Sequence, residues 1–217
     1  MATLFSLVAI VLGVALGMAV QAVHEAALSE FGRGLRTLAG EADLQVIGAR
    51  GGFDEQLYAV LAARPEVAEA SPLVEVEAKL VGRDETLKLL GVDVFALARV
   101  SPLLLPRAAE GADRFATLSD DGIFVSAAAQ AALGIRPGDQ LRVQAGAAEV
   151  ELRVVGDVPG AGEERRLAVM DIAAVQALFG TPGRVSRIDL RLAAGLGLRA
   201  ARDALQARLP AGVMVAV

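Results

Sequence analysis

The feature that most constrains this chain is an uncharged, apolar run near its N-terminus. Between residues 4 and 23 no side chain carries a charge, and only Ser6 and Gln21 are strongly polar. An α-helix rises about 1.5 Å per residue, so a run of this length crosses about 30 Å of hydrocarbon. The run therefore predicts a membrane-spanning helix. No later stretch is long and apolar enough to predict a second span.

Two glycines indicate how this span packs. Gly13 and Gly17 share one face of a helix in the GxxxG arrangement. Lipid provides no hydrophobic drive for helices to associate, so small residues that let two backbones come close favour packing. Gly13 and Gly17 are therefore candidate packing residues of the membrane helix. The alternative is that glycine is simply common in apolar helices.

A secretory signal peptide is the alternative to a retained span. Its apolar core would be shorter than this run, and a basic segment should precede it. Residues 1–3 include no lysine or arginine, although residues 20–22 could serve as a cleavage site. Arg33 and Arg36 follow the run, so a count of basic residues alone would place most of the chain in the cytoplasm. Charge therefore does not decide the orientation.

The helical pattern continues past the span over residues 24–38. Apolar side chains recur there at spacings of three and four residues, which places them on one face. These side chains are Leu28, Phe31, Leu35 and Leu38. Gly32 and Gly34 each weaken such a helix by about 1 kcal/mol relative to alanine. We expect an amphipathic stalk that uses the four apolar side chains for packing and loosens before Gly40.

The composition limits the classes of function. The chain has 217 residues, with 26 acidic and 21 basic side chains and a net charge of −5. Because a nucleic-acid surface needs clustered lysine and arginine to neutralise phosphates, this balance argues against nucleic acid as a partner. The chain has no cysteine, which excludes disulfides, thiol catalysis and thiolate metal sites. About 190 residues follow the span, enough for one large domain or two small ones.

The region after the stalk begins and ends with the same order of strand, helix, proline and strand. The first unit has a strand at 43–47, a helix at 54–63 with Leu57, Val60 and Leu61 facing inward, Pro65 and a strand at 74–80. The second has a strand at 188–192, a helix at 198–209, Pro210 and a strand at 213–217. Neither unit could bury its sheet face alone, so we expect the two to share one sheet in an α+β sandwich.

An insertion over residues 86–184 separates these units. Its apolar patterns predict strands around 86–92, 122–125, 140–144, 149–155 and 167–170. They also predict two short helices, at 127–133 between a Ser126 cap and Gly134, and at 172–179 between an Asp171 cap and Gly180. Residues 101–112 show no periodicity and are expected to form a loop. Residues 159–166 are expected to form the most mobile tip.

The sequence predicts no catalytic, cofactor-binding or metal site. His24 is the only histidine, and no second histidine or cysteine completes a metal site with it. Ser126 follows a strand and begins a helix, but its neighbours do not form G-x-S-x-G, so a helix cap is the better interpretation. Residues 120–121 are a carboxylate pair more typical of a turn than of a catalytic dyad. We therefore expect a protein without enzymatic activity.

Several short motifs resemble those of a known family. They are the segments 42–46 (Ala-Asp-Leu-Gln-Val), 90–93 (Leu-Gly-Val-Asp), 121–126 (Asp-Gly-Ile-Phe-Val-Ser), 132–139 (Ala-Leu-Gly-Ile-Arg-Pro-Gly-Asp) and 154–156 (Val-Val-Gly). In this order, after a single N-terminal span, they resemble the periplasmic core domain of MacB- and FtsX-type ABC transporter permeases. The helix that leads into Leu-Gly-x-x-x-Gly-Asp before a strand is the most specific part.

The resemblance implies an α+β fold with a defined division. It places the transmembrane helix and stalk in residues 1–40, a porter-like α+β sandwich in residues 41–85 and 185–217, and a β-rich lobe in residues 86–184. It further implies an inner-membrane protein with one span in this chain and the rest on the periplasmic or extracellular side. Such permeases carry further spans, so this sequence is expected to be part of a longer chain.

The resemblance also implies the partners and the role. The implied partners are the membrane, a separate cytoplasmic ABC ATPase, and further permease spans or a second permease copy. ATP-driven motion would be transmitted through the stalk to export or extract a lipid, lipoprotein or peptide. The alternatives from the sequence are a secreted binding or adaptor domain with a signal peptide and, more remotely, a hydrolase that uses Ser126.

Overall fold

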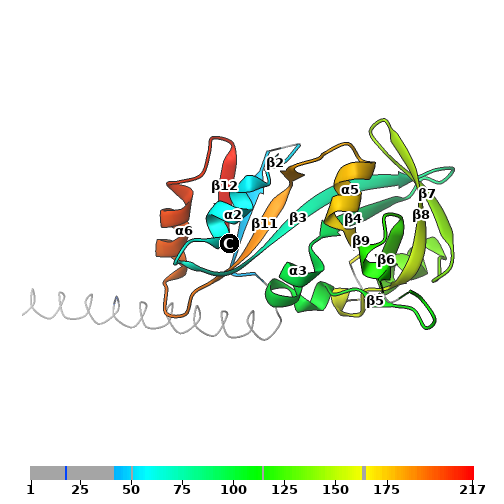
Figure 1. Ribbon diagram of the computed structural model, residues 1–217, viewed down its shortest axis with the longest axis horizontal. Coiled ribbons are helices and arrows are strands. Elements are labelled where there is room, and N and C mark those ends of the chain that lie inside the picture. Colours follow the sequence, from blue (N-terminus) through cyan, green and yellow to red (C-terminus); the bar gives the residue numbers. More distant parts are fainter. Residues whose placement is uncertain (1–17, 19–41, 50, 114, 163–164) are drawn as a thin grey trace, which may run out of the picture. The chain divides into compact units, whose positions relative to one another are not determined.

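The computed structural model describes Met18 and residues 42–49, 51–113, 115–162 and 165–217 (Figure 1). Gly40–Val217 form one compact unit. Met18 is helical, and the rest of the predicted span and stalk lies outside the described residues, including Gly13, Gly17, Leu28, Phe31, Leu35 and Leu38. Within the part of the chain that is described, no helix has both the length and the apolar character needed to cross a membrane.

Strands dominate the compact unit. They are β1 (Leu44–Gly48), β2 (Phe53–Asp54), β3 (Val67–Leu80), β4 (Thr86–Val92), β5 (Arg107–Ala108), β6 (Gly122–Val125), β7 (Gln140–Ala145), β8 (Ala148–Asp157), β9 (Leu167–Asp171), β10 (Arg184–Val185), β11 (Arg187–Leu192) and β12 (Val213–Ala216). The helices are α2 (Gln56–Ala62), α3 (Val94–Val100), α4 (Ala127–Leu133), α5 (Ile172–Leu178) and α6 (Leu198–Gln206), with single 3-10 turns η1 (Pro102–Leu104), η2 (Ala116–Leu118) and η3 (Pro159–Ala161). The α+β class predicted from the sequence is confirmed.

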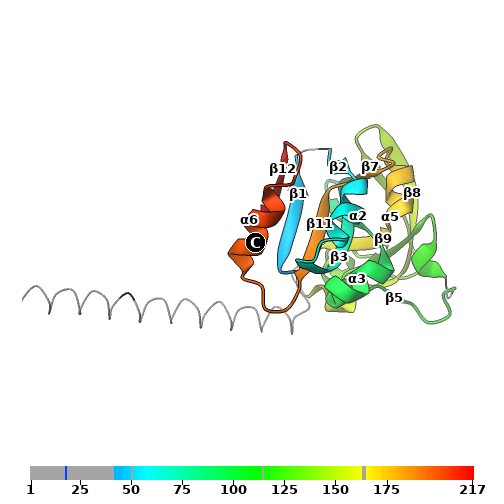
Figure 2. The same cartoon turned by 60° about the vertical axis from the view of Figure 1, so that its left-hand side comes forward.

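The two ends of this region pair in one antiparallel sheet, in the order β12-β1-β11-β3. Val46 on β1 lies opposite Ile188 on β11 and Val215 on β12, and Ile188 in turn lies opposite Pro72 on β3. Figure 2 shows β1 in blue between the red β12 and the orange β11. The expectation that the two sequence-distant units share a sheet is therefore correct. We call β12, β1, β11 and the first half of β3 the four-stranded sheet.

The second half of β3 belongs to a closed ring of strands. From β3 the pairing continues through β4, β9, β6 and β8, and β7 then pairs with both β8 and the end of β3. Ring closure leaves few free strand edges, which limits unwanted pairing with other chains. We call the second half of β3 with β4, β9, β6, β8 and β7 the six-stranded ring.

A single long strand, β3, therefore runs through both parts (Figure 1). Its N-terminal stretch pairs with β11, and its pairing with β4 begins where Leu73 lies opposite Val92. Before Leu73, no second strand among the described residues pairs with β3. Pro72 lies in this stretch, and proline is tolerated at a sheet edge because no ladder bond needs its missing N–H. The predicted strand at 74–80 is thus extended back to Val67.

Apolar side chains gather on both faces of the sheet. Successive strand residues point to opposite faces, so Val74 and Leu89 join one core while Leu73 and Leu90 join the other. Side chains of α2, α4, α5 and α6 complete the first core, and those of α3, η1, η2 and η3 complete the second. The fold is thus layered, with helical elements over each face of a shared β-structure.

The predicted helix caps of the insertion are confirmed. The Ser126 hydroxyl accepts a hydrogen bond from the Ala129 N–H at the start of α4, and Gly134 ends this helix in the left-handed region, with φ of 65°. The Asp171 carboxylate accepts bonds from the N–H groups of Ala173 and Ala174 at the start of α5. These local contacts satisfy backbone donors that have no partner inside the helix.

Two expectations about local structure are wrong. Val60 does not face inward but is 60% exposed, because α2 presents Leu57, Tyr58 and Leu61 to the sheet and Val60 falls outside that stripe. Residues 101–112 are not loop throughout, since they contain η1 and β5. The tip expected at 159–166 begins with η3, in which Ala161 is buried and Gly160 lies close to the backbone of Leu103, and its mobility stays a prediction.

Candidate functional site

The geometry of Ser126 excludes it as a nucleophile. Its side chain is fully buried, and its hydroxyl donates a hydrogen bond of 2.6 Å to the carbonyl oxygen of Arg165. The same oxygen accepts bonds from the N–H groups of Leu167, at 3.1 Å, and Ala129, at 3.3 Å. Ser126 thus ties α4 to the segment that enters β9. A nucleophile needs an accessible oxygen beside a base, and this oxygen is used to hold the backbone.

The carboxylate pair at residues 120–121 forms part of a turn. The Ser119 hydroxyl donates to Asp121 over 2.6 Å, and Arg153 lies 3.6 Å away. These contacts, the Ser119 bond first, keep the pKa of Asp121 below its ordinary value, against the effect of burial. Asp121 therefore stays ionised and is unsuited to donate a proton at neutral pH. The described ranges contain no group of three or more potential metal ligands.

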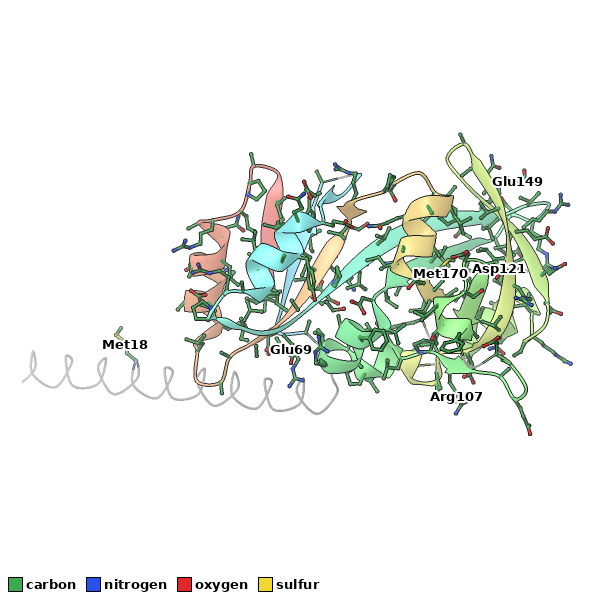
Figure 3. The ribbon with its side chains drawn as sticks, in the orientation of Figure 1. Met18, Glu69, Arg107, Asp121, Glu149 and Met170 are labelled. Carbon is green, nitrogen blue, oxygen red and sulfur yellow. The ribbon has the colours of Figure 1, made fainter. Side chains whose placement is uncertain are left out.

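An open pocket of about 660 Å³ lies beside this turn, at the edge of the six-stranded ring. Asp121, two residues after Ser119 in the pocket wall, is labelled in Figure 3. The large apolar side chains at its rim are Phe115 and Leu118, which are 58% and 51% exposed, and Arg153, Glu110 and Asp113 are its charged groups. This pocket was not predicted from the sequence, because residues 101–112 lack any periodic pattern.

A second feature is a chain of charged side chains where β11, β3 and β4 meet. One carboxylate oxygen of Glu75 lies 2.7 Å from the Lys88 ammonium group, and the other lies 2.7 Å from the guanidinium group of Arg187. Arg187 also contacts Asp189, with Nε 2.7 Å from Oδ1 and a hydrogen bond of 3.2 Å to Oδ2. Four charges from three strands are thus joined on one face of the sheet.

Asp189 is the buried member of this chain of charges, with 2% of its surface exposed. Burial raises the pKa of its carboxyl group, which the neighbouring Arg187 opposes. The Oδ1 atom lies close to Arg187 without the alignment of a hydrogen bond. Among the residues that the structure describes, the buried hydroxyl of Ser71, opposite Asp189 on β3, has no hydrogen-bond partner. Buried polar groups without a well-aligned hydrogen bond lower the free energy of unfolding, so burying Asp189 and Ser71 here is unfavourable for stability.

A smaller pocket of about 340 Å³ opens next to Glu75 and Arg187. The glycine turn that follows β1 forms its opposite wall and is held by Arg184, whose guanidinium group donates to the carbonyl oxygens of Gly51 and Gly52. Gly52 adopts φ of 69°, and a Cβ atom there would meet the backbone of Val185. The charged side chains that face this turn were not predicted from the sequence.

Comparison with known proteins identifies related sequences and folds. The model of the MacB-like periplasmic core domain matches residues 3–208. An ABC transporter permease protein of Mycobacterium tuberculosis, named as uncharacterized, is 29% identical over 96% of this chain. That alignment covers 25% of the relative, so the chain spans about a quarter of the length of this protein.

Two solved structures share the fold. The extracellular domain of the noncanonic ABC-type transporter YknZ from Gram-positive bacteria superposes with a TM-score of 0.54 and 14% identity, over 80% of this chain and 99% of that one. The periplasmic region of MacB from Actinobacillus actinomycetemcomitans gives a TM-score of 0.54 and 11% identity, over 80% and 87% of the two chains. At these identities the likeness concerns the fold alone.

Proposed function

Because the chain belongs to the MacB-like periplasmic core domain family, we propose that it is the extracytoplasmic domain and first span of an ABC transporter permease. In this role it has no catalytic activity of its own. It transmits the ATP-driven motion of a separate cytoplasmic ATPase to the export or extraction of a lipid, lipoprotein or peptide. Its partners are the membrane, that ATPase, and further permease spans or a second permease copy.

The position of β1 is the observation that best supports this role. The segment from the membrane enters the compact unit at Asp43, whose N–H donates to the Leu190 carbonyl and whose carboxylate accepts from the Leu192 N–H, both over 2.9 Å. The strand that follows is flanked on both sides, by β11 and by β12. A displacement of this segment therefore acts on the interior of the four-stranded sheet, not on a loose edge.

We propose the same division of the chain into a membrane part and two parts of the extracytoplasmic domain as the sequence predicts. Residues 1–40 form the span and stalk, residues 41–85 and 185–217 the porter-like part, and residues 86–184 the inserted lobe. Gly13 and Gly17 pack the span against another membrane helix, and Leu28, Phe31, Leu35 and Leu38 pack the stalk. The protein resides in the inner membrane, with residues 41–217 outside the cytoplasm.

Hydrogen exchange of the full-length permease, purified with its ATPase, tests the coupling. Trapping the complex with ATP and vanadate should change the amide exchange of β1 and β11 relative to the nucleotide-free complex, because these strands receive the motion first. The same comparison with an ATPase that binds but does not hydrolyse ATP separates binding from turnover. Identical exchange throughout residues 42–217 in all states would refute the transmission role.

An alkaline phosphatase fusion after Val217 in the full-length chain tests the location. The fusion should be active, because the enzyme matures only outside the cytoplasm. N-terminal sequencing of the membrane fraction should find residues 1–22 retained. Their removal would instead support a secreted binding or adaptor domain.

A further inference from the structure

The four-stranded sheet and the six-stranded ring meet at one residue of β3. Leu73 lies opposite Arg187 on one side and opposite Val92 on the other. Pro72, immediately before it, has no N–H with which to add a ladder bond. The backbone pairing is thus continuous within each part, and the two pairings overlap at a single position of β3.

Side chains tie the two parts together beside this position. Glu75 lies two residues into the ring half of β3 and uses its two oxygens separately. One oxygen contacts Arg187 on β11, in the four-stranded sheet, and the other contacts Lys88 on β4, in the ring, each over 2.7 Å. The Glu75 N–H also donates to the Ser186 hydroxyl over 2.9 Å, just before β11.

We propose that the Glu75 bridge (Lys88, Glu75 and Arg187) fixes the angle between the four-stranded sheet and the six-stranded ring. The bridge then makes a motion that enters through β1 and β11 move the ring as well. This inference rests on the proposed function for its purpose, but the bridge itself is a property of the domain. Glu75 is in this sense a positioning residue.

The chemistry of the bridge requires a carboxylate. Only a carboxylate offers two equivalent acceptor oxygens to two cations, and such charge-assisted contacts are stronger than neutral hydrogen bonds. The side chains of Glu75 and Arg187 are 27% and 19% exposed, so water screens this pair less than a surface pair. An amide keeps the shape of Glu75 but has one acceptor, so it cannot hold both cations.

A second set of side-chain contacts also connects the four-stranded sheet with the six-stranded ring, in addition to the Glu75 bridge. Helix α3 follows β4 directly, and Arg99 near its end pairs with Glu69 on β3 over 2.7 Å. Figure 3 shows Glu69 beside this helix. In addition, Arg191 on β11 donates to the Arg99 carbonyl oxygen over 2.9 Å. Loss of the bridge should therefore widen the range of angles between the two parts without unfolding either one.

Spin-label distances in the full-length chain test the bridge. Residues 1–217 contain no cysteine. Once any cysteine elsewhere in the full-length chain is replaced, Ala147→Cys in the exposed turn of the ring and Ala200→Cys on the exposed side of α6 give a single labelled pair. Glu75→Gln should broaden the distance distribution between the labels, and Lys88→Gln should broaden it in the same way. Combining the two changes should add little, because each breaks the same bridge.

Glu77→Gln is the matched control. Glu77 is exposed, lies two residues further along β3 and faces Lys88 across the strand pair. It should leave the distance distribution as in the parent chain, with circular dichroism confirming that every variant is folded. A parent-like distribution in both Glu75→Gln and Lys88→Gln would overturn the proposal, and so would equal broadening by Glu77→Gln.

The labels are measured without nucleotide, so the outcome does not depend on the transport role. If Glu75→Gln broadens the distance distribution but ATP does not change the hydrogen exchange of the complex, the proposed function is refuted and the bridge stands. If the distance distribution stays parent-like in Glu75→Gln and Lys88→Gln but ATP does change the hydrogen exchange of the complex, the bridge is refuted and the proposed function stands. If Glu75→Gln does not fold, Lys88→Gln decides, since Lys88 is the more exposed partner, at 45%.

Discussion

Asp189 shows how one buried side chain links folding to pH. Its carboxylate faces Arg187 on its own strand, Glu75 and the Ser71 hydroxyl on β3, and Gln45 opposite on β1. Burial, the largest influence, raises the pKa of Asp189 above its ordinary value near 3.8, and Arg187 only partly offsets it. The folded chain therefore holds this proton at a pH where the unfolded chain has released it.

The sign of the effect on stability follows from this shift. Where the folded state binds more protons than the unfolded state, the free energy of unfolding falls as pH rises. The stability that protonated Asp189 contributes is therefore fully present below the ordinary pKa of about 3.8 and is lost as pH rises through its folded pKa. The difference in unfolding free energy between the parent domain and Asp189→Asn should decline over this window. Urea titrations at several pH values measure it, and a constant difference would contradict the assignment.

The hydroxyl of Ser126 gives a second prediction at the residue scale. Ser126→Ala removes a buried hydroxyl that donates to the Arg165 carbonyl and accepts from the N–H groups of Leu167 and Ala129. We expect a loss of about 1–3 kcal/mol in the free energy of unfolding, as for lost caps and unsatisfied buried groups. Chemical denaturation measures it. An unchanged midpoint would mean that water or a shifted backbone replaces the hydroxyl.

At the scale of elements, the sequence predicted those that local chemistry determines. Strands β4 and β6 and helix α4 occur where alternation and capping residues place them, since Ser126, Gly134 and the alternating residues of β4 act on their own neighbours. Helix α3 was not predicted, although Asp93 caps it with bonds to the N–H groups of Phe95 and Ala96. Its apolar residues read equally well as a continuation of β4, and only packing on β3 and β11 selects a helix.

Features that depend on contacts between distant parts of the sequence could not be predicted from local patterns. A proline such as Pro72 usually indicates the end of a strand. It is tolerated inside β3 because, among the described residues, β3 pairs with only one strand at this position. The charges of Glu75, Lys88 and Arg187 read as ordinary solvent-facing residues, because the contact that joins them depends on strands far apart in sequence. The open pocket beside Arg153 was hidden for the same reason. Candidate residues at 13, 17, 28, 31, 35 and 38 stay predictions.

The packing of α5 on β4 gives a prediction for this scale. A Cβ atom at Gly91 would lie 2.9 Å from the side chain of Val175, whereas one at Gly197, the cap of α6, would meet nothing within 4 Å. Gly91→Ala should therefore cost about 1–3 kcal/mol of unfolding free energy, because the helix must move away from the strand. Gly197→Ala is the control for the added methyl group: it meets no neighbour, so it should cost only about 1 kcal/mol, because alanine caps a helix less well than glycine. Thermal unfolding of both variants measures the contrast, and equal midpoints would show that α5 moves freely.

At the scale of the whole molecule, the domain is proposed to act through its membrane helix and stalk. If Gly13 and Gly17 face a partner helix, Gly17→Leu should disrupt assembly of the membrane complex, because leucine holds the two helix axes apart. The domain beyond residue 40 should still fold in this variant. Purification of the variant complex with parent stoichiometry would rule out the packing role.

The stalk requires a separate change. Leu35→Asp places a charge on the apolar face shared with Leu28, Phe31 and Leu38, so it should leave membrane insertion intact but weaken coupling. ATPase activity that depends on the permease measures the coupling, and membrane fractionation checks insertion. Normal coupling in both Leu35→Asp and Gly17→Leu would mean that the helix serves only as an anchor.

The placement of β1 between β11 and β12 also sets the order in which the domain can fold. As the chain emerges from N- to C-terminus, β1 comes well before its partners near Ile188 and Val215. The strands of the six-stranded ring all lie between them and can pair earlier. Pairing over such long sequence separations is slow, and an unpaired strand is prone to associate with other chains. Strand β1, which is proposed to receive the motion in the folded protein, is thus the strand that stays unpaired longest during synthesis.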